Sequence, residues 1–461
     1  MIKQQKINIS VTNLILINSL MTNKIEIKEK VKNFKKIIKV GSDKSISIRC
    51  VLLASQAIGK SRIYNLLESE DVFDALKAIK KLGIKFKKRK NFYEIEGFGL
   101  DGYNTKQKIT IDAGNSGTLA RLILGLLVNS KNIVTLKGDK SLSKRDFSRV
   151  VEPLKLFGAN ISYKNSFLPV HINGSNYLRP IKYHENLGSA QCKSAIMLAS
   201  LKTPGITKIK AKKSRDHTEL LFKNLGIPIK IIKKKIYDFI DIKGPFNFEG
   251  FDYKVPGDIS SSSFFIVLTL LSQNSSLIIK NVNINKTRTG IIKILNKMNA
   301  NISFKNKKKY KGEFLGDISV KSKKNLKSII CPKKLNSSAI DEFLIIFLVA
   351  AKAKGNSVFR DLGELNKKES PRLNIAIKIL RQIGVKILRN KNDIKIFGNP
   401  KLELTGSYTI KNFRKDHRVL MMSCVAALTL GGSWTIHDSN SSNTSFPDFF
   451  KKIKKLGGVI N

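Results

Sequence analysis

The chain has 461 residues, which is enough for two or three ordinary domains, and its 42% of hydrophobic residues is normal for a globular protein. It carries 85 lysines and arginines against 34 aspartates and glutamates, a formal charge of +51. No apolar run approaches the length of a membrane-spanning helix. Composition thus excludes a protein built from membrane-spanning helices, and it raises nucleic acid as a partner to consider.

The lysines, however, are spread over many short clusters, such as residues 208–213 and 305–310. Few aromatic residues interleave with them at the spacing that stacks bases. We therefore expect no nucleic acid and no membrane among the partners, and we expect the charge to steer small acidic substrates. A non-catalytic protein that binds nucleic acid stays open as an alternative.

The N-terminus and the cysteines bear on cellular location. Residues 1–27 are predicted to form a disordered N-terminal extension, because the apolar residues 14–17 are too short for a signal peptide. The cysteines are far apart and show no metal-binding or CxxC spacing: Cys50, Cys192, Cys331 and Cys424. We therefore expect a reduced cytoplasmic protein without a metal.

Residues 41–49, GSDKSISIR, open the first long apolar helix. Ser45 is suited to a helix start, and Arg49 lies four residues on, on the same helix face. Lys44, Ser45 and Arg49 thus converge where unpaired N–H groups and the helix macrodipole attract anions. The stretch predicts capture of phosphate or carboxylate.

A helix end that recurs along the chain indicates an internal repeat. An amphipathic helix ends in glycine or, once, asparagine at Gly83, Gly158, Gly226, Asn299, Gly384 and Gly457. These residue types tolerate the left-handed conformation that closes a helix. Their spacing of roughly 70–85 residues, with a β-rich stretch after most of them, predicts six βαβ-type units.

A second signal with the same period is the polar opening of an apolar helix. These openings lie at residues 43–45, 115–118, 189–191, 258–261, 337–342 and 415–418. Helices that are apolar on all sides are buried, so their polar N-termini are expected to face a site. Six units exceed one core, which predicts an α/β fold with two domains of three units and a cleft between them.

Charged residues at these turns are candidates for chemistry. Arginine suits bidentate capture of carboxylate and phosphate, and a carboxylate among cations stays ionised and can act as a general base. No Gly-x-Ser-x-Gly, Walker A or Rossmann glycine motif occurs. The basic candidates are Lys44, Arg49, Arg121, Arg145, Arg215, Lys368, Arg372 and Arg418; the acidic ones are Asp341, Glu342, Glu369 and Asp416.

Ten motifs carry a family resemblance. They are residues 41–49, 114–118, 138–145, 189–195, 214–219, 255–261, 341–342, 368–372, 416–418 and 444–447. In order and in type they resemble those of the EPSP synthase family, over about residues 30–461. The resemblance implies transfer of the enolpyruvyl group of phosphoenolpyruvate to the 5-hydroxyl of shikimate 3-phosphate, with release of phosphate and without a metal or organic cofactor.

The resemblance also implies an inside-out α/β barrel of two domains that closes on its substrates. The first domain is expected to combine residues 28–43 with 256–461, and the second to hold residues 44–255. We expect a monomer whose partners are the two small-molecule substrates.

Roles for single residues follow from the same resemblance. Asp341 is expected to take the proton of the 5-hydroxyl and Glu369 to protonate the methylene carbon, with Lys44 and His417 assisting. Shikimate 3-phosphate is expected to contact Lys44, Ser45, Arg49, Ser189, Ala190, Gln191, Ser214, Arg215, Asp341 and Lys368. Phosphoenolpyruvate, whose space the inhibitor glyphosate also fills, is expected to contact Lys44, Asn115, Gly117, Arg145, Gln191, Arg372 and Arg418.

The chain departs from the family pattern at a few positions. Asp146 and Phe147 stand where proline and an apolar residue are usual. Pro371 replaces an aspartate, and Thr444 stands where some members have a substrate-binding lysine. The nearest rival is the related enolpyruvyl transferase acting on UDP-N-acetylglucosamine, which typically has a loop cysteine beside phosphoenolpyruvate, and no cysteine here has that setting.

Overall fold

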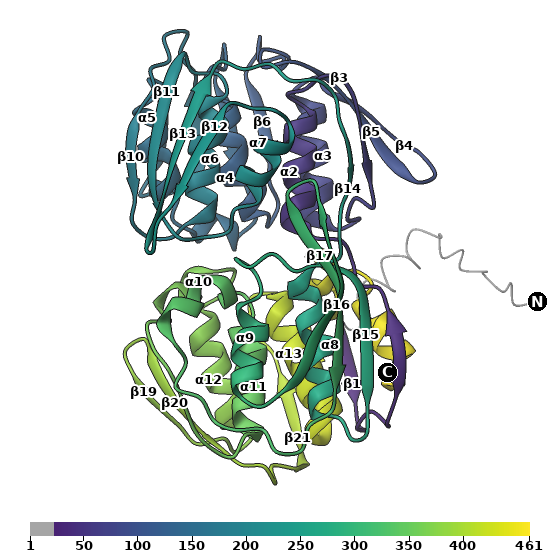
Figure 1. The fold of residues 1–461 in the computed structure, drawn as a ribbon. Coiled ribbons are helices and arrows are strands. Elements are labelled where there is room, and N and C mark those ends of the chain that lie inside the picture. The colour runs from purple at the N-terminus through teal and green to yellow at the C-terminus, as the bar shows by residue number, and fades with distance from the viewer. Residues whose placement is uncertain (1–22) are drawn as a thin grey trace, which may run out of the picture.

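The computed structural model describes residues 23–461, which form two lobes stacked one above the other (Figure 1). One hydrophobic core holds buried side chains between residues 46 and 255, and we call this part the upper lobe, as it is drawn in Figure 1. The second core holds buried side chains from residues 27–38 and 259–460, and we call this part the lower lobe. The chain therefore passes between the lobes twice.

The upper lobe contains three four-stranded sheets with the orders β14-β3-β5-β4, β6-β7-β9-β8 and β10-β11-β13-β12. In each sheet the first two strands are parallel and the other neighbours are antiparallel. The strands are β3 (Ile58–Tyr64), β4 (Lys85–Lys88), β5 (Phe92–Phe98), β6 (Ile109–Asp112), β7 (Val134–Lys137), β8 (Asn160–Lys164), β9 (Phe167–Asn173), β10 (Lys182–Glu185), β11 (Gly205–Lys212), β12 (Ile229–Lys233), β13 (Tyr237–Gly244) and β14 (Asp252–Lys254). The helices are α2 (Lys44–Ala54), α3 (Glu70–Lys81), α4 (Gly117–Leu126), α5 (Ser148–Lys155), α6 (Ala190–Ser200) and α7 (His217–Asn224).

The lower lobe contains three further sheets with the orders β16-β17-β15-β2, β18-β20-β19 and β1-β22-β21. The strands are β1 (Lys24–Ile27), β2 (Lys35–Ile38), β15 (Ser276–Asn283), β16 (Asn301–Tyr310), β17 (Glu313–Lys321), β18 (Gly355–Phe359), β19 (Ile387–Asn390), β20 (Asp393–Gly398), β21 (Leu404–Ile410) and β22 (Gly431–His437). The helices are α8 (Ile259–Leu271), α9 (Gly290–Lys297), α10 (Asn336–Ala339), α11 (Phe343–Lys352), α12 (Arg372–Gln382), α13 (His417–Leu430) and α14 (Phe449–Lys455). The six sheets correspond to the six predicted units.

The predicted extension ends earlier than residue 27, which corrects that boundary. Residues 24–27 form strand β1, which pairs antiparallel with β22 in the register Lys24↔His437 to Ile27↔Trp434. Ile27 is fully buried in the lower core. The strand is only four residues long, so its alternation is too short to be distinguished in the sequence. The rest of the predicted extension, residues 1–22, lies outside the described residues.

The recurrent helix ends are confirmed. Gly83, Gly158, Gly226, Asn299, Gly384 and Gly457 all have positive φ, between 69° and 107°. A residue with a Cβ is strained there, which explains why glycine and asparagine mark the ends of these helices.

Six inner helices run through the two cores: α2, α4 and α6 in the upper lobe and α8, α11 and α13 in the lower lobe. They are buried almost along their whole length, as predicted. Five of them begin at a side chain that accepts a hydrogen bond from the first turn, at Asp43, Ser116, Ser189, Asp258 and Asp416. Among residues 23–461, no helix combines the length and apolar character that crossing a membrane requires.

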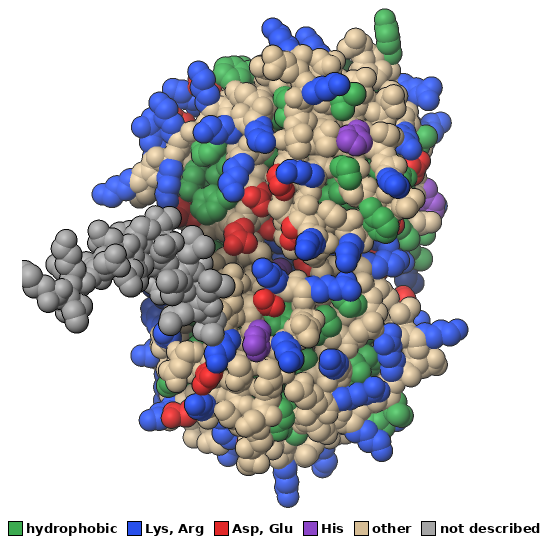
Figure 2. Space-filling view, turned by 180° about the vertical axis from the view of Figure 1, so that it is seen from behind, with side chains coloured by type: hydrophobic (Ala, Val, Ile, Leu, Met, Phe, Trp, Pro, Cys, Tyr) green, Lys and Arg blue, Asp and Glu red, His purple; other side chains and the backbone are tan. Residues whose placement is uncertain are grey.

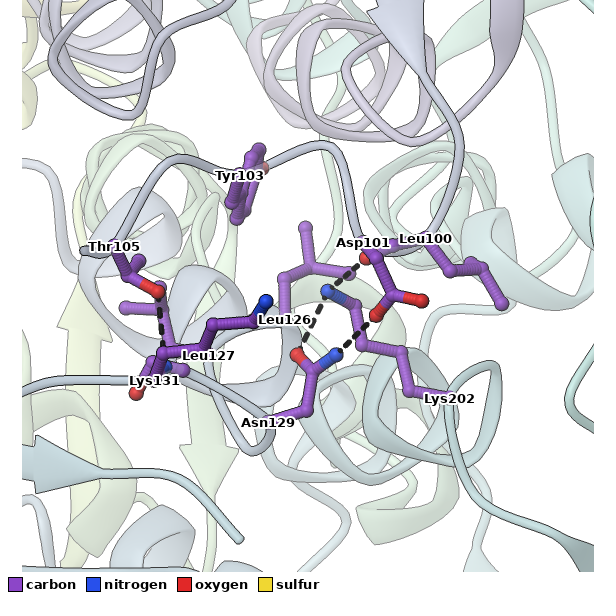
Figure 3. A pocket seen from close by; sticks show the side chains of 10 residues that line it. Leu100, Asp101, Tyr103, Thr105, Leu126, Leu127, Asn129, Lys131 and Lys202 are labelled. Atoms are coloured by element: carbon purple, nitrogen blue, oxygen red, sulfur yellow. Dashed lines mark hydrogen bonds between the residues drawn. The ribbon is translucent and has the colours of Figure 1, made fainter. Parts of the chain in front are cut away.

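The far end of the inner helices in the upper lobe encloses a cavity of about 20 Å³, room for about one water molecule (Figure 3). Lys202 lies in it, just beyond the end of α6, with 8% of its surface exposed. Its ammonium group donates to the carbonyl oxygen of Leu100 at 2.5 Å and to Oδ1 of Asn129 at 3.0 Å. Burial lowers the pKa of Lys202 to about 7.

This lowered pKa predicts a pH-dependent stability. Between pH 7 and the ordinary lysine value of about 10.4, the unfolded chain holds one more proton than the folded chain at Lys202. The free energy of unfolding should therefore rise by about 1.4 kcal/mol per pH unit in this window, and this contribution is absent below it. Lys202→Met removes the titrating group. In urea unfolding, the free energy of unfolding of the wild type relative to that of the variant should therefore rise by about 1.4 kcal/mol between pH 8 and pH 9. The exposed Lys182→Met variant is the control, and an equal gap at both pH values for Lys202→Met would contradict the assignment.

Candidate active site

Side chains from the turns just before α5, α7, α11 and α12 meet across the boundary between the lobes. Arg215 of the upper lobe donates to Oδ2 of Asp341 of the lower lobe at 2.5 Å. Nη1 of Arg145 lies 3.7 Å from Oε1 of Glu369, and Oγ of Ser141 donates to the Glu369 carbonyl oxygen at 2.9 Å. The structure therefore brings together predicted residues from both halves of the chain.

Asp341 lies between α10 and α11, and four cations surround its carboxylate. Nitrogen–oxygen distances are 2.5 Å to Arg215, 3.2 Å to Arg372, 3.7 Å to Lys368 and 3.9 Å to Arg418. Burial alone would raise the pKa of Asp341, but these positive charges outweigh it and hold the pKa well below its usual range. Asp341 is therefore an ionised carboxylate with 12% of its side chain exposed, able to accept a proton from a bound hydroxyl.

Glu369, just before α12, is held by two arginines. Arg372 donates to its carboxylate, and Arg145 approaches from the other lobe. Burial would raise the pKa of Glu369, but Arg372 and Arg145 outweigh that effect and hold the pKa well below its usual range. In this structure Glu369 is thus ionised and has no proton to give.

Arg372 is the link between the two acidic residues. Besides Asp341 and Glu369, it binds Asp416, whose Oδ2 accepts from Nε at 2.9 Å. Arg372 is 1% exposed, and the carboxylates around it raise its pKa although burial acts in the opposite direction. The neighbouring Pro371, one of the departures, precedes α12 as its N-cap residue.

His417, the first residue of α13, is buried. Its Nδ1 lies 3.2 Å from Oγ1 of Thr444, and its Nε2 has no partner among the described residues. Burial, together with the positive charge of Arg418, lowers the pKa of His417 to about 3. His417 is therefore neutral, and it can assist as a hydrogen-bonding group but not as a cation.

Lys44 and Arg49 project from α2. Nζ of Lys44 contacts Oδ2 of Asp71 at 2.8 Å. Arg49 donates to Oγ1 of Thr218 at 2.8 Å and to Oγ of Ser194 at 3.1 Å. The two cations of the first motif are therefore fixed by hydroxyl and carboxylate groups from α3, α6 and α7.

A second group of cations surrounds the start of α4. Asn115 accepts a hydrogen bond from Arg145, and Gln191 accepts one from Arg121 at 2.8 Å. Gly117 lies under both arginines, because a Cβ built there would be 2.9 Å from Nη1 of Arg145 and 3.0 Å from Nη1 of Arg121. Absence of a side chain at residue 117 is what lets the two guanidinium groups approach the helix start.

Within residues 23–461, some predicted residues form no side-chain hydrogen bond with Asp341 or Glu369. Ser189 caps α6, Ala190 follows it, and Oγ of Ser214 is buried without a partner among the described residues. For Ser45, the structure shows its carbonyl oxygen accepting from Arg49 at 2.9 Å.

Among the groups on predicted residues that sequence reasoning missed are Asp71 on Lys44, and Thr218 and Ser194 on Arg49. Arg121 was a candidate without a role, and it binds Gln191. Thr218 and Ser194 lie inside the matched motifs, so their position there was the available signal. Asp71 has no comparable signal, because it lies in an amphipathic helix outside every matched motif.

Comparisons with known proteins show the family to which the chain belongs. A sequence model of the EPSP synthase family (3-phosphoshikimate 1-carboxyvinyltransferase) matches residues 28–453. A 3-phosphoshikimate 1-carboxyvinyltransferase from Thermodesulfovibrio yellowstonii is 38% identical over 432 residues, 93% of this chain and 98% of that protein. One from Bacillus cytotoxicus is 36% identical, over 91% of this chain and 97% of that protein.

Solved structures show the same relationship. The structure of EPSP synthase from Acinetobacter baumannii has a TM-score of 0.82 and 33% identity, covering 95% of this chain and 99% of that one. The enolpyruvyl transferase NikO from Streptomyces tendae has a TM-score of 0.75 at 14% identity, with the same coverage, and shows the fold alone. These similarities confirm the predicted two-domain α/β fold, and the chain belongs to the EPSP synthase family.

Proposed function

We propose that the boundary between the lobes is where this chain carries out the reaction of its family: transfer of the enolpyruvyl group of phosphoenolpyruvate to the 5-hydroxyl of shikimate 3-phosphate, with release of phosphate. Family membership supports the reaction. The observation that carries the placement is the ionised Asp341, held among cations from both lobes. Two substrates that each bear phosphate and carboxylate groups suit so many fixed cations.

We place shikimate 3-phosphate along Lys44, Ser45, Arg49, Ser189, Ala190, Gln191, Ser214, Arg215, Asp341 and Lys368. Phosphoenolpyruvate is placed along Lys44, Asn115, Gly117, Arg145, Gln191, Arg372 and Arg418. Support comes from the contacts above, in which Arg215 and Lys368 approach Asp341, while Arg145 and Arg372 approach Glu369. Oγ of Ser214 and Nε2 of His417, both buried and without a partner among the described residues, are available to a substrate.

In the proposed first stage, Asp341 takes the 5-hydroxyl proton as that oxygen forms a bond to C2 of phosphoenolpyruvate, and Glu369 gives a proton to C3. In the second stage, Glu369 takes a proton back from C3, and the bond between C2 and the phosphate oxygen breaks as the double bond is restored. Phosphate leaves with the proton that Asp341 took from the 5-hydroxyl, so that Asp341 is again ionised. Lys44 and the arginines stabilise the charge on the phosphate that departs. The reaction needs no organic cofactor, and we propose none.

Glu369 must gain a proton before the first stage, because Arg372 and Arg145 hold it ionised in this structure. The anionic groups of phosphoenolpyruvate offer the two guanidinium groups other partners. Their hold on Glu369 then weakens, and its pKa rises toward the value that burial favours. Proton uptake by Glu369 is thus coupled to substrate binding.

The rival acceptor, UDP-N-acetylglucosamine, is not favoured. The four cysteines are buried and unpaired, and Cys50, Cys192 and Cys424 lie within inner helices. A role in binding nucleic acid is not favoured either, because lysines and arginines are spread over both lobes on the face seen in Figure 2 rather than gathered into one stripe. We further propose a cytoplasmic monomer, for which the unpaired cysteines support the reducing location.

The division into domains also remains a proposal. We assign residues 24–43 and 256–461 to one domain and 44–255 to the other, with the start moved to include β1. The two separate hydrophobic cores support this division.

Phosphate release from phosphoenolpyruvate tests the reaction. We expect release only when shikimate 3-phosphate is also present. UDP-N-acetylglucosamine in its place is the control, and release with that acceptor but not with shikimate 3-phosphate would overturn the proposal.

A second expectation concerns shape. Arg215 of the upper lobe and Arg372 of the lower lobe both approach Asp341. Anionic substrates bound between such cations neutralise their mutual repulsion, so the two substrates together should draw the lobes closer. Small-angle scattering should show a smaller radius of gyration with both substrates than with phosphoenolpyruvate alone. No change at saturating concentrations of both would count against closure.

A further inference from the structure

The two chain crossings between the lobes lie side by side. The backbone N–H of Asp43 donates to the Pro256 carbonyl at 2.8 Å, and that of Asp258 donates to the Gly41 carbonyl at 2.9 Å. Asp43 and Asp258 are also the N-cap residues of α2 and α8. The helix that carries Lys44 therefore begins at the point where the lobes are joined.

One arginine outside every matched motif binds both N-cap residues. Arg288, in the loop between β15 and α9, donates from Nη1 to Oδ2 of Asp43 at 3.1 Å and from Nη2 to Oδ1 of Asp258 at 3.0 Å. It is 2% exposed and also donates to Oγ of Ser260 at 2.8 Å. Burial disfavours its charge, but Asp43 and Asp258 outweigh burial and raise the pKa of Arg288.

The same two carboxylates hold the backbone at Lys44. Oδ1 of Asp43 accepts from the N–H of Ile46 at 2.9 Å, and Oδ2 of Asp258 accepts from the N–H of Lys44 at 3.3 Å. Each carboxylate thus uses one oxygen for Arg288 and the other for the first turn of α2. A planar guanidinium can bridge two carboxylates in this way, whereas an ammonium group is a single point of charge.

The network continues into the upper lobe through α7. Nη1 of Arg288 also lies 3.2 Å from Nε2 of His217, whose Nδ1 is 2.6 Å from Oε1 of Glu313 in β17. Because Arg288 is a donor, Nε2 accepts and the ring proton is assigned to Nδ1, facing Glu313. The neighbour Thr218 binds Arg49, so the same network supports a second cation of the site.

We propose that Arg288 is a positioning residue for the reaction: by bridging Asp43 and Asp258 it fixes the start of α2, and thereby sets where Lys44 meets both substrates. Arg288 itself contacts neither substrate in the proposed site. The effect of Arg288 on catalysis rests on the proposed function. Its effect on the start of α2 concerns the protein without substrates and does not depend on that function.

The test compares Arg288→Lys with wild type and with Arg149→Lys. Arg149 is a suitable control, because it also crosses the lobes in a bidentate ion pair, with Glu364 at 2.9 and 3.1 Å, but holds no inner helix start. Hydrogen–deuterium exchange on the full chain without substrates should be faster in the peptide covering residues 41–49 for Arg288→Lys and unchanged there for Arg149→Lys. In the kinetic assay Arg288→Lys should raise KM for both substrates together and lower kcat/KM by about 10²-fold, the typical cost of a displaced catalytic group.

Unchanged exchange at residues 41–49 would overturn the proposal, and so would faster exchange with kinetic constants within twofold of wild type. A folding defect alone lowers the apparent kcat but leaves KM unchanged, and that result would overturn it too. Where Arg288→Lys gives no folded protein, Asp43→Asn is the second variant, because its amide oxygen can still cap α2 while the charge that binds Arg288 is lost; the same outcomes apply. A wild-type chain without transfer activity would refute the proposed function, and the exchange result would then decide the role of Arg288 by itself.

Discussion

Replacing Asp341 by asparagine is expected to lower kcat by about 10²–10⁴-fold, the usual effect of losing a general base. Asparagine keeps the size of the side chain but cannot take the 5-hydroxyl proton. Binding should suffer much less, because the variant removes a negative charge that competes with the substrates for Arg215 and Arg372. Glu369→Gln is expected to have an effect of the same order, because glutamine cannot exchange a proton with C3.

Steady-state kinetics of the two variants checks this expectation. Glu364→Gln is the matched control, since Glu364 also pairs across the lobes but with Arg149, away from the acidic pair. The control should keep kcat within a few-fold of wild type. Near-normal turnover in both Asp341→Asn and Glu369→Gln would show that the proposed roles are wrong.

Gly117→Ala is expected to raise the inhibition constant of glyphosate more than KM for phosphoenolpyruvate, in a wild-type chain that is itself sensitive. Glyphosate is the longer of the two molecules in the proposed shared space, and a small steric change of this kind is worth about 10–200-fold in discrimination. The structure adds a detail that the sequence did not contain. The new methyl group first meets Arg145 and Arg121, at 2.9 and 3.0 Å.

Both arginines are held by hydrogen bonds, Arg145 to Asn115 and Arg121 to Gln191, and the methyl group strains these bonds when it displaces the guanidinium groups. A smaller rise in KM for phosphoenolpyruvate is therefore expected as well. Competitive inhibition curves for wild type and variant measure both constants. An equal rise in the inhibition constant and in KM would mean that displacement of the arginines dominates, and that the variant does not discriminate by the length of the bound molecule. A wild type that glyphosate does not inhibit would mean that the departures at Asp146 and Pro371 have reshaped the shared space.

The sequence predicted the repeat well because its signals are local. A helix end such as Gly83 is encoded by the residue that must adopt positive φ, and a buried helix such as α13 by an unbroken apolar run. The candidate residues came from motifs at the starts of those helices, together with the family resemblance. Strand β1 was missed because four residues carry too little pattern.

Contacts between distant segments were beyond sequence reasoning. Arg215 and Asp341 are 126 residues apart, and no spacing rule connects them. Arg288 is further from its partner Asp43, by 245 residues, and its surroundings resemble an ordinary loop followed by a helix. The pKa of Glu369 is lowered first by Arg372, three residues away, and in addition by Arg145 from the other lobe. Such contacts form only when distant segments of the chain have folded against one another.

The orientation of the inner helices has a consequence for the release of product. Each helix presents the equivalent of about half a positive charge at its N-terminus, so several such ends add a field that no change of pH can titrate away. Inorganic phosphate, once formed, remains in that field as long as the lobes are together. Separating the lobes moves the two sets of helix ends apart and admits water, which weakens the hold on the anion. We therefore expect the rate at which the lobes part to set an upper bound on turnover, independent of how fast the bonds are made and broken.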